Sequence, residues 1–595
     1  MGTDYHAWTS LPRMFFEQAA RHGDKPFLWA KQNRRYAPLS WTEVAERVNA
    51  FANGLIALGA RPGERVMLVS ENRPEWLIAD LGIMAAGCVT VPAYVTNTVS
   101  DHLHVMNDSG SSFVVASTAK LSFAVLKAID QSNAMPRLIA IEQPEISQTS
   151  GEPPVSWQEV EALGRGAPLP LAVKNAKRDD LACLIYTSGT GGAPKGVMLT
   201  HGNILHNCLG AEKLLETVGL DNEVFLSFLP LSHAYEHTAG QFFPITIGAQ
   251  IYYGEGLDKL STNLVEAHPT IMTAVPRLYE LLRDRILQAM ERETGLKAHF
   301  FRQAVALGIK AYQEPGSLSL AERAYNRLLD AVVRRKMADR FGGRLKAMVS
   351  GGGPLNLDVG LFFHALGVPI LQGYGQTEAA PVVSCNPPRK VKMHTVGLAL
   401  EGVEVMIALD GEILVRGPLV MSGYWNNPKA TRETIDRDGW LHTGDIGVID
   451  HDGYIQITDR KKDIIVNSGG DNIAPQRVEG FLTLEPEIAQ AMAYGDKRPH
   501  LVAVVVPDAE YAMDWAEANG KPKNFAKLLA DPHFEDMIRA AVNRVNAKLS
   551  NIEKVRRFLI ADAPFTVDNG LMTPTLKVKR HKIIDIYGER LEGLY

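Results

Sequence analysis

The chain has 595 residues, of which 46% are hydrophobic and 22% charged, with 51 glycines and 33 prolines. This composition is that of a globular α/β enzyme and excludes a disordered or fibrous protein, and the length predicts two or more domains with a cleft between them. The formal net charge of −5 gives no basis for a nucleic-acid-binding protein, which normally carries a strong basic excess.

Cysteine usage and the N-terminus bear on the cellular compartment. The four cysteines, Cys88, Cys183, Cys208 and Cys385, show neither disulfide nor metal-ligand spacing, which is typical of a reducing compartment. The first residues lack a basic start followed by an apolar run, and no window approaches the roughly 20 apolar residues of a membrane span. We therefore expect a cytoplasmic protein whose membrane contact, if any, is peripheral. Nothing in the sequence indicates an oligomeric state.

Residues 41–160 alternate between helical and extended patterns. Residues 41–59 are amphipathic with a helical period, residues 64–70 are an apolar run typical of a buried strand, and residues 75–87 again favour a helix. The shorter runs CVTVPAY and SSFVVAS suit parallel strands covered by helices on both faces. The sequence therefore predicts an α/β fold, with a large N-terminal domain of several subdomains whose mixed or parallel sheets are flanked by helices.

A glycine-rich loop follows an apolar strand in CLIYTSGTGGAPKGVMLTHGNIL, and we expect it to lead into a helix. Glycines let backbone N–H groups turn towards an anion, while hydroxyl groups and a lysine add donors and a cation. The spacing is not that of a Walker A loop, because Gly196 is followed by Val197 instead of lysine. A flexible surface loop is the alternative. The residues that would hold phosphate are Thr187, Ser188, Gly189, Thr190, Gly191 and Lys195.

The segment LPLSHAYEHTAG contains His233, Glu236 and His237 in the order H-x-x-E-H, the inverted zinc-protease motif. On that interpretation the two histidines bind Zn²⁺ and Glu236 is the general base. Pro230 precedes the segment and no third ligand is evident, which argues against zinc. A zinc hydrolase is therefore kept as a remote alternative.

From Tyr279 the pattern changes to long, highly charged helices, broken at residues 314–316. We interpret residues 284–346, approximately, as an inserted pair of helices. Residues 291–346 hold 12 Lys or Arg and 6 Asp or Glu, although the whole chain is negative. This excess would favour an anionic membrane surface, while an ordinary solvated face is the simpler interpretation.

Two glycine-rich segments each follow an apolar strand: SGGGPL at residues 350–355 and GYGQTE at residues 373–378. Alone, each is typical of a tight turn. Further on, WLHTGDIG presents Asp445 on an expected turn, where a carboxylate can accept hydrogen bonds from both ribose hydroxyls. Arg460 in TDRKKD offers a second ribose or phosphate contact, although the segment is also typical of a solvated charged turn.

Short strands begin at Ile407, and a charged segment follows at residues 458–466. We place a domain boundary there, giving an N-terminal domain of residues 1–460 and a C-terminal domain of residues 461–595. The second domain carries the apolar run VAVVVP, a helical pattern at residues 534–549 and the basic segment LKVKRHKI. These features predict a small α+β lid.

In chain order, YTSGTGGAPKGV, GYGQTE, WLHTGDIG and TPTLKVKR resemble the signatures of the AMP-forming acyl-CoA synthetases, luciferases and peptide-synthetase adenylation domains. The resemblance spans Trp41 to Arg580 and is strongest to long-chain fatty acid–CoA ligases. It implies that a medium- or long-chain fatty acid reacts with ATP to give acyl-AMP and pyrophosphate, and that coenzyme A then displaces AMP. One departure is Gly192-Ala193, near which the family has a threonine.

The resemblance also implies which residues contact the nucleotide. Tyr374 would stack on adenine, and Thr377 would contact the α-phosphate. Glu378 and Thr187 would hold Mg²⁺, a hard cation that prefers oxygen ligands. The residues expected to contact ATP or AMP are Thr187, Ser188, Gly189, Thr190, Gly191, Lys195, Gly352, Gly373, Tyr374, Gly375, Thr377, Asp445 and Arg460.

The remaining implied roles concern catalysis and the lid. Lys577, and not Lys579, matches the catalytic lysine that would offset developing charge in the transition state. His233 would lie beside the acyl carboxylate, His237 stands where some long-chain members have an aromatic gate, and Lys462 would be the hinge. The expected catalytic set is Lys577, His233, Thr187 and Glu378. Gly469 and Gly470 would face coenzyme A.

Two further functions stay open beside the ligase and the zinc hydrolase. The first is adenylation of another carboxylic acid with transfer to a carrier protein, and the second is a luciferase-like oxygenase. The expected partners are a fatty acid, ATP, Mg²⁺ and coenzyme A, without nucleic acid.

Overall fold

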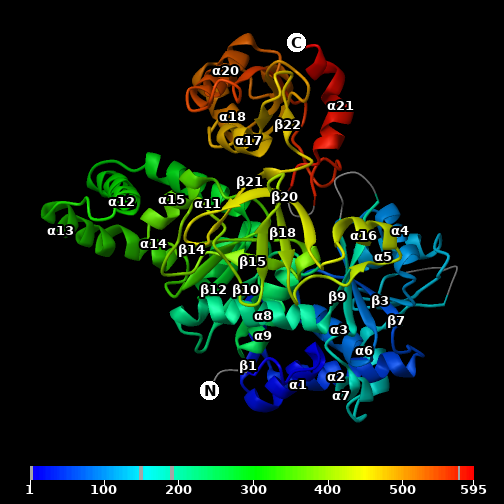
Figure 1. The fold of residues 1–595 in the computed structure, drawn as a ribbon. Coiled ribbons are helices and arrows are strands. Elements are labelled where there is room, and N and C mark those ends of the chain that lie inside the picture. The colour runs from blue at the N-terminus through cyan, green and yellow to red at the C-terminus, as the bar shows by residue number, and fades with distance from the viewer. Residues whose placement is uncertain (1–3, 146–151, 188–192, 574–576) are drawn as a thin grey trace.

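Two large β-sheets and their covering helices form the body of the protein (Figure 1). The computed structural model describes residues 4–145, 152–187, 193–573 and 577–595. In these parts of the chain, no helix combines the length and the apolar composition needed to cross a membrane. The predicted α/β fold is confirmed.

The first large sheet has eight strands in the order β19-β9-β8-β4-β3-β5-β6-β7, with parallel pairing at its centre. Its strands are β3 (Arg65–Val69), β4 (Val89–Ala93), β5 (Phe113–Ala116), β6 (Arg137–Ala140), β7 (Val155–Ser156), β8 (Leu181–Thr187), β9 (Lys195–Thr200) and β19 (Gly423–Tyr424). The associated helices are α2 (Trp41–Ala57), α3 (Pro74–Ala85), α4 (Val99–Ser109), α5 (Ala119–Ile129), α6 (Trp157–Gly164) and α7 (Leu171–Asn175). A capping box of Ser40 and Glu43 begins α2 where the sequence predicted it. Because α3 is apolar all round, it is buried and contacts strands of both large sheets.

The second large sheet has nine strands in the order β16-β15-β14-β13-β12-β10-β11-β1-β2. Its strands are β1 (Pro26–Gln32), β2 (Arg35–Ser40), β10 (Val224–Ser227), β11 (Gln250–Tyr253), β12 (Ile271–Ala274), β13 (Ala347–Ser350), β14 (Ile370–Gly375), β15 (Val382–Cys385) and β16 (Leu398–Ala399). The centre is parallel and the two edges are antiparallel. Its helices include α1 (Leu11–His22), α8 (His201–Leu215), α9 (Phe243–Thr246), α10 (Leu260–Ala267) and α15 (Leu357–Ala365). The sheet thus carries β13 and β14, which lead directly into the two predicted glycine-rich site segments.

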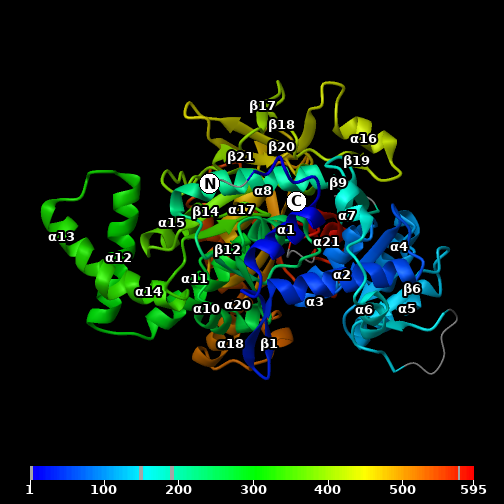
Figure 2. The same ribbon diagram turned by 90° about the horizontal axis from the view of Figure 1, so that it is seen from below.

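A helical lobe projects from the body between β12 and β13 (Figure 1 and Figure 2). It contains α11 (Pro276–Glu291), α12 (Leu296–Gln313), α13 (Leu320–Leu329), a π-helical segment (Asp330–Arg334) and α14 (Arg335–Arg340). The break predicted at residues 314–316 is confirmed, but the predicted pair of helices is wrong. Gly295, with φ of 71°, separates α11 from α12, so the part before the break at residues 314–316 forms two helices instead of the one that was predicted.

A four-stranded antiparallel sheet leads to the C-terminal region, which lies at the top of Figure 1. The sheet contains β17 (Glu404–Ile407), β18 (Glu412–Arg416), β20 (Leu441–Ile449) and β21 (Ile455–Arg460), with α16 (Pro428–Thr434) beside it. The C-terminal region contains β22 (Ile465–Val466), β23 (Asn472–Ile473), α17 (Pro475–Leu482), β24 (Ile488–Tyr494), β25 (Leu501–Pro507), α18 (Ala509–Ala518), α19 (Phe525–Leu528), α20 (Pro532–Asn546), β26 (Val555–Ile560) and α21 (Arg580–Glu592). It has apolar clusters of its own around β25. The boundary at residue 460 stays a prediction.

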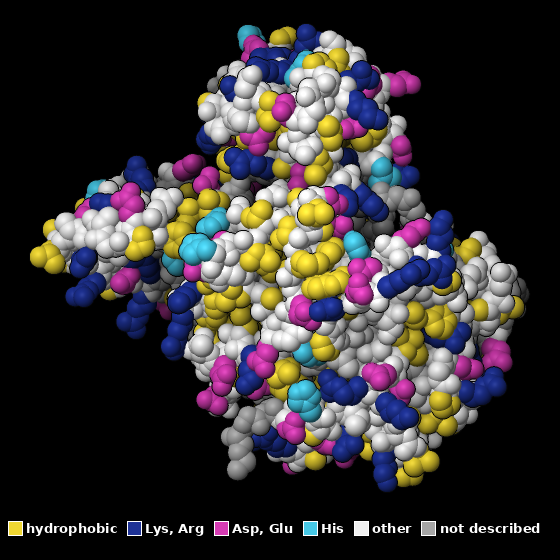
Figure 3. Space-filling view, viewed as in Figure 1, with side chains coloured by type: hydrophobic (Ala, Val, Ile, Leu, Met, Phe, Trp, Pro, Cys, Tyr) yellow, Lys and Arg dark blue, Asp and Glu magenta, His cyan; other side chains and the backbone are white. Residues whose placement is uncertain are grey.

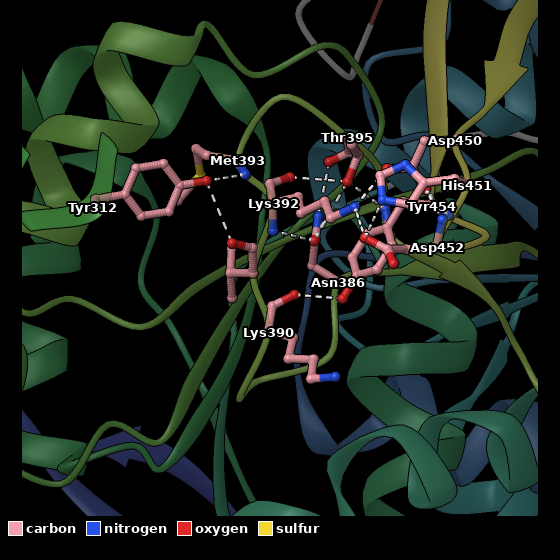
Figure 4. Close-up of polar contacts among 12 residues, drawn as sticks. Tyr312, Asn386, Lys390, Lys392, Met393, Thr395, Asp450, His451, Asp452 and Tyr454 are labelled. Carbon is pink, nitrogen blue, oxygen red and sulfur yellow. Dashed lines mark hydrogen bonds and ion pairs between the residues drawn. The ribbon is translucent and has the colours of Figure 1, made fainter. Parts of the chain in front are cut away.

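Residues 386–395 connect the helical lobe with the four-stranded sheet (Figure 4). The Lys392 ammonium donates hydrogen bonds of 2.6 Å to both Asp450 and Asp452. On the other side, the Tyr312 hydroxyl of α12 accepts a 2.7 Å hydrogen bond from the backbone N–H of Met393. The lobe is therefore fixed to the sheet that ends at the predicted hinge.

Candidate active site

The predicted phosphate loop joins two antiparallel strands. Thr187 ends β8 and Lys195 begins β9, and these two residues are paired in the ladder. Ser188, Gly189, Thr190 and Gly191 lie outside the described residues. The prediction of a helix directly after the loop is wrong: residues 195–200 continue the ladder, and α8 begins only at His201, where the Thr200 side chain caps it.

Tyr424 connects the base of this loop with a predicted metal ligand. Its ring lies against Lys195, with the ammonium nitrogen 4.1 Å from the ring centroid. Its hydroxyl donates a 2.8 Å hydrogen bond to Oε1 of Glu378, which lies on the 3₁₀ turn Thr377–Ala379. Burial and the charge of Glu378 raise the pKa of Tyr424, so the hydroxyl keeps its proton and remains a donor. Tyr424 was not predicted as a site residue, because a two-residue strand such as β19 has no periodicity to detect.

Asp445 is the centre of a buried polar group at the predicted nucleoside site. Its Oδ2 accepts a 2.7 Å hydrogen bond from the Tyr374 hydroxyl, and its Oδ1 accepts one of 2.9 Å from Nε of Arg460. Asp445 and Arg460 are direct partners across the β20–β21 ladder. The turn predicted at Asp445 is wrong, because LHTGDIGVI forms the continuous strand β20. Each carboxylate oxygen keeps a second lone pair, so Asp445 can still accept ribose hydroxyls.

The turn predicted for GYGQTE begins later than expected, because its first three residues end β14. The glycines here permit close approach of the chain to itself. A Cβ atom on Gly375 would lie 1.9 Å from the carbonyl oxygen of Pro381, and one on Gly373 would lie 3.2 Å from that of Ser384. Gly352, with φ of 81°, lies in the turn after β13, as predicted. The strand thereby presents Tyr374 at a fixed position between two tightly packed glycines.

Lys577 approaches this site from the C-terminal region. Burial, and then the positive charge of Arg460, lower the pKa of Lys577 to about 8. The carboxylates of Asp445, Asp463 and Glu378 act in the opposite direction. The residue nevertheless remains exposed to solvent, so water reaches the side chain although many protein atoms lie around it. Figure 3 shows the surface hollowed where the C-terminal region meets the body.

His233 lies close to Lys577 and stays neutral. Burial, and then the Lys577 charge, lower the pKa of His233 to about 4, so its imidazole is uncharged at physiological pH. Nδ1 lies 3.2 Å from the backbone N–H of Tyr235 and accepts from it. That hydrogen bond assigns the remaining proton to Nε2, which makes Nε2 a donor.

The other two residues of H-x-x-E-H have partners within the fold. Nε2 of His237 is 2.9 Å from Oδ2 of buried Asp80, and the Glu236 carboxylate accepts a hydrogen bond from Thr273. Burial raises the pKa of Glu236 to about 7. His233 and His237 are one helical turn apart, since the His237 N–H donates to the His233 carbonyl oxygen, and the π-helical segment Glu236–Phe242 begins within that turn. In the described parts of the chain, no group of three or more His, Cys, Asp or Glu side chains could hold a metal ion, which leaves the zinc alternative without a ligand set.

The predicted hinge follows a residue that is fixed to the body. The Lys461 ammonium forms ion pairs with Asp410 at 2.7 Å and Glu412 at 3.0 Å, and its backbone N–H donates to the carbonyl oxygen of Gly444. Lys462 is the next residue. Gly469 and Gly470 lie on an exposed turn between β22 and β23, and no contact with the nucleotide-site residues is recorded for them within the described chain.

Comparisons with known proteins identify the family. The AMP-binding enzyme model matches residues 15–425, and the AMP-binding enzyme C-terminal domain model matches residues 462–595. A long-chain-fatty-acid–CoA ligase of Mycobacterium bovis is 35% identical over 568 residues, covering 93% of this chain and 92% of that protein. Long chain acyl-CoA synthetase 7 of Arabidopsis thaliana, a peroxisomal protein, is 32% identical, covering 94% and 82%. Human long-chain-fatty-acid–CoA ligase 1 is 31% identical, covering 97% and 84%.

Solved structures share the fold at lower identity. The adenylation domain of a carboxylate reductase from Mycobacterium chelonae has a TM-score of 0.76 at 23% identity, covering 98% of this chain and 91% of that one. ATP-bound MatB from Rhodopseudomonas palustris has a TM-score of 0.70 at 22% identity, covering 97% and 99%. These structures support the architecture, and the sequence matches extend over both regions of the chain. The chain belongs to the AMP-binding enzyme family.

Proposed function

We propose that this protein activates a medium- or long-chain fatty acid with ATP and transfers the acyl group to coenzyme A. The observation that carries the proposal is the convergence of Lys577 on Asp445, Arg460 and Glu378, residues that come from three separate segments of the chain. The relatives named as long-chain-fatty-acid–CoA ligases support the choice of acid and acceptor. The four buried free thiols fit a reducing, cytoplasmic location.

In this proposal the body of the protein holds ATP. Tyr374 presents its ring to adenine while its hydroxyl fixes Asp445, and Asp445 and Arg460 take the ribose. Lys195, whose ammonium lies over the Tyr424 ring, would be on the phosphate side. Glu378 and Thr187 fit Mg²⁺, because they supply a carboxylate and a hydroxyl oxygen and this ion takes few protein ligands besides phosphates and water. When bound, Mg²⁺ would neutralise phosphate charge.

Adenylation needs positioning and charge neutralisation, and no covalent nucleophile on the protein. His233, neutral with its Nε2 proton outward, would hold one oxygen of the acyl carboxylate by hydrogen bonding. Lys577 is mostly protonated at pH 7, because its pKa of about 8 leaves roughly ten ammonium groups for each amine. It would stabilise the charge that develops as the carboxylate attacks the α-phosphate.

The lid comprises residues 461–595 and turns about Lys462 in this proposal. Rotation would withdraw Lys577 after adenylation and bring the turn with Gly469 and Gly470 towards coenzyme A. Both residues lie on an exposed turn, so a ligand can approach their backbone closely.

Pyrophosphate release across a panel of carboxylic acids, with and without coenzyme A, tests the function. We expect release to depend on acids of medium or long chain and thioester to form only with coenzyme A. Release that depends on no acid would refute the adenylating activity. Acid-dependent release without acyl-CoA formation would instead indicate a carrier protein as acceptor.

A further inference from the structure

We propose that the outer face of α13 and α14 docks on an anionic lipid bilayer. The face begins with an exposed apolar stripe of Leu320, Ala324 and Leu328. The two leucines expose 83% and 49% of their surfaces. At about 100° per residue these three positions fall within an arc of about 80° on the helix, so they form one continuous stripe.

The stripe is a second apolar face of a helix whose first apolar face is already covered. Leu329 is fully buried, and Tyr325 meets the ring of Phe300 from α12 with centroids 6.4 Å apart. These inward residues join the small cluster that holds α13 on α12. Packing within the lobe therefore does not explain the exposed leucines on the opposite side.

Basic side chains border the stripe without acidic partners. On α13, Arg323 and Arg327 lie along one edge, and Arg335 and Lys336 continue the surface on α14; all four are exposed. None of these four forms an ion pair with another residue that the structure describes. Two acids of α13 and the π-helical segment are already engaged, because Glu322 pairs with Lys310 and Asp330 pairs with Arg334. Asp339 on α14 is exposed and leaves the local charge positive beside the four basic side chains.

Charge separation across the molecule favours a negatively charged partner for this lobe. Residues 291–346 carry 12 Lys or Arg and 6 Asp or Glu, a net charge of +6. The whole chain carries −5, so the remaining residues carry −11. An anionic surface would attract the lobe and repel the body. The molecule would therefore be oriented with the lobe facing that surface.

The shape of the lobe favours a bilayer. Figure 1 and Figure 2 both show α13 at the outermost edge of the projecting lobe, and Figure 3 shows Lys and Arg side chains along that projection. A convex helix with leucines between arginines matches interfacial helices, which bury their apolar face at the headgroup boundary while basic side chains meet lipid phosphates.

Sedimentation with lipid vesicles tests this surface. We expect the full-length protein to bind phosphatidylcholine vesicles containing phosphatidylglycerol, to bind pure phosphatidylcholine much more weakly, and to dissociate as salt is raised. The double variant Arg323→Gln and Arg327→Gln should weaken partitioning about 25-fold, at about fivefold for each basic residue near an anionic surface. Arg437→Gln, also exposed but on the body, is the matched control and should bind like the parent.

The leucines are tested separately. Leu320→Ser together with Leu328→Ser should lower vesicle binding at least tenfold, whereas Leu171→Ser, which replaces a leucine exposed by 75% on α7, should not. Acid-dependent pyrophosphate release with a soluble medium-chain acid, unchanged in every variant, confirms that each protein is folded. Equal binding to neutral and anionic vesicles, or equal binding by lobe and control variants, would overturn the proposal.

A fluorescent label identifies the contacting face directly. The four native cysteines are buried, so Ala324→Cys can be labelled selectively with an environment-sensitive dye. We expect a blue shift with anionic vesicles, and none for the same dye at Leu171→Cys. A lipid-free dimer that the double leucine variant abolishes would assign the stripe to a second copy of the chain and refute the bilayer.

Discussion

Replacing Lys577 by alanine removes a lid cation that interacts with the carboxylates of the proposed nucleotide site. A positioned charge in such a site stabilises a transition state by about 3 to 4 kcal/mol, so adenylation should fall by about 10² to 10³. Thioester formation from supplied acyl-AMP should be almost unchanged, because in the proposed mechanism the lid would then have turned and carried Lys577 out of the site. The matched control is Lys579→Ala, two residues further along at the start of α21.

The pH dependence follows from the pKa of about 8 for Lys577. The ammonium form is the active one, so kcat/KM for adenylation should be constant near neutral pH and fall tenfold for each unit above about 8. Lys577→Arg keeps the positive charge, since guanidinium stays protonated far above that range. This variant should therefore lose the alkaline decline near pH 8, even where its absolute rate is lower.

Pyrophosphate release measures the first half-reaction, and thioester formation from synthetic acyl-AMP measures the second. Equal losses in both half-reactions for Lys577→Ala would contradict its assignment to adenylation. An unchanged decline near pH 8 in Lys577→Arg would show that another group titrates. Either result would refute the argument from its position among the carboxylates.

Two further predictions address contacts within the body. Tyr424→Phe keeps the ring beside Lys195 but removes the hydrogen bond to Glu378. We expect the Mg²⁺ concentration for half-maximal adenylation to rise about tenfold, because hydrogen bonds to charged groups contribute about 1.5 to 3 kcal/mol. An unaltered Mg²⁺ titration would contradict this role. Gly375→Ala places a methyl group 1.9 Å from a backbone oxygen and should lower the free energy of unfolding by about 3 kcal/mol or more. Gly373→Ala should cause less than half that loss. Equal urea midpoints for the two variants would contradict the prediction, because they would show that the backbone moves to accommodate the methyl group.

The spacing of apolar residues in the sequence correctly predicted regular elements such as α2 and β3, because one face of such an element is buried along its whole length. The prediction was wrong where pairing with a neighbouring strand holds a glycine-rich segment in a strand, although its local composition is typical of a turn. Glycines made the segments around Tyr374 and Asp445 look like turns, yet both lie in strands held by adjacent ladders. Tyr424 escaped prediction for a related reason: its position beside Lys195 depends on β19 joining the edge of β9, a contact across more than 200 residues.

The contacts around the hinge explain how one site can serve two half-reactions. Lys461 is fixed to the body by two carboxylates, so rotation at Lys462 begins just after the last residue that the body holds. Arg460 precedes it and stays paired with Asp445 on β20. In the proposed mechanism the ribose contacts would therefore remain in place while Lys577, which lies beyond the proposed hinge, moves away. On the proposed mechanism AMP would stay bound to the body during the exchange, while Lys577, which offsets charge in adenylation, would be withdrawn.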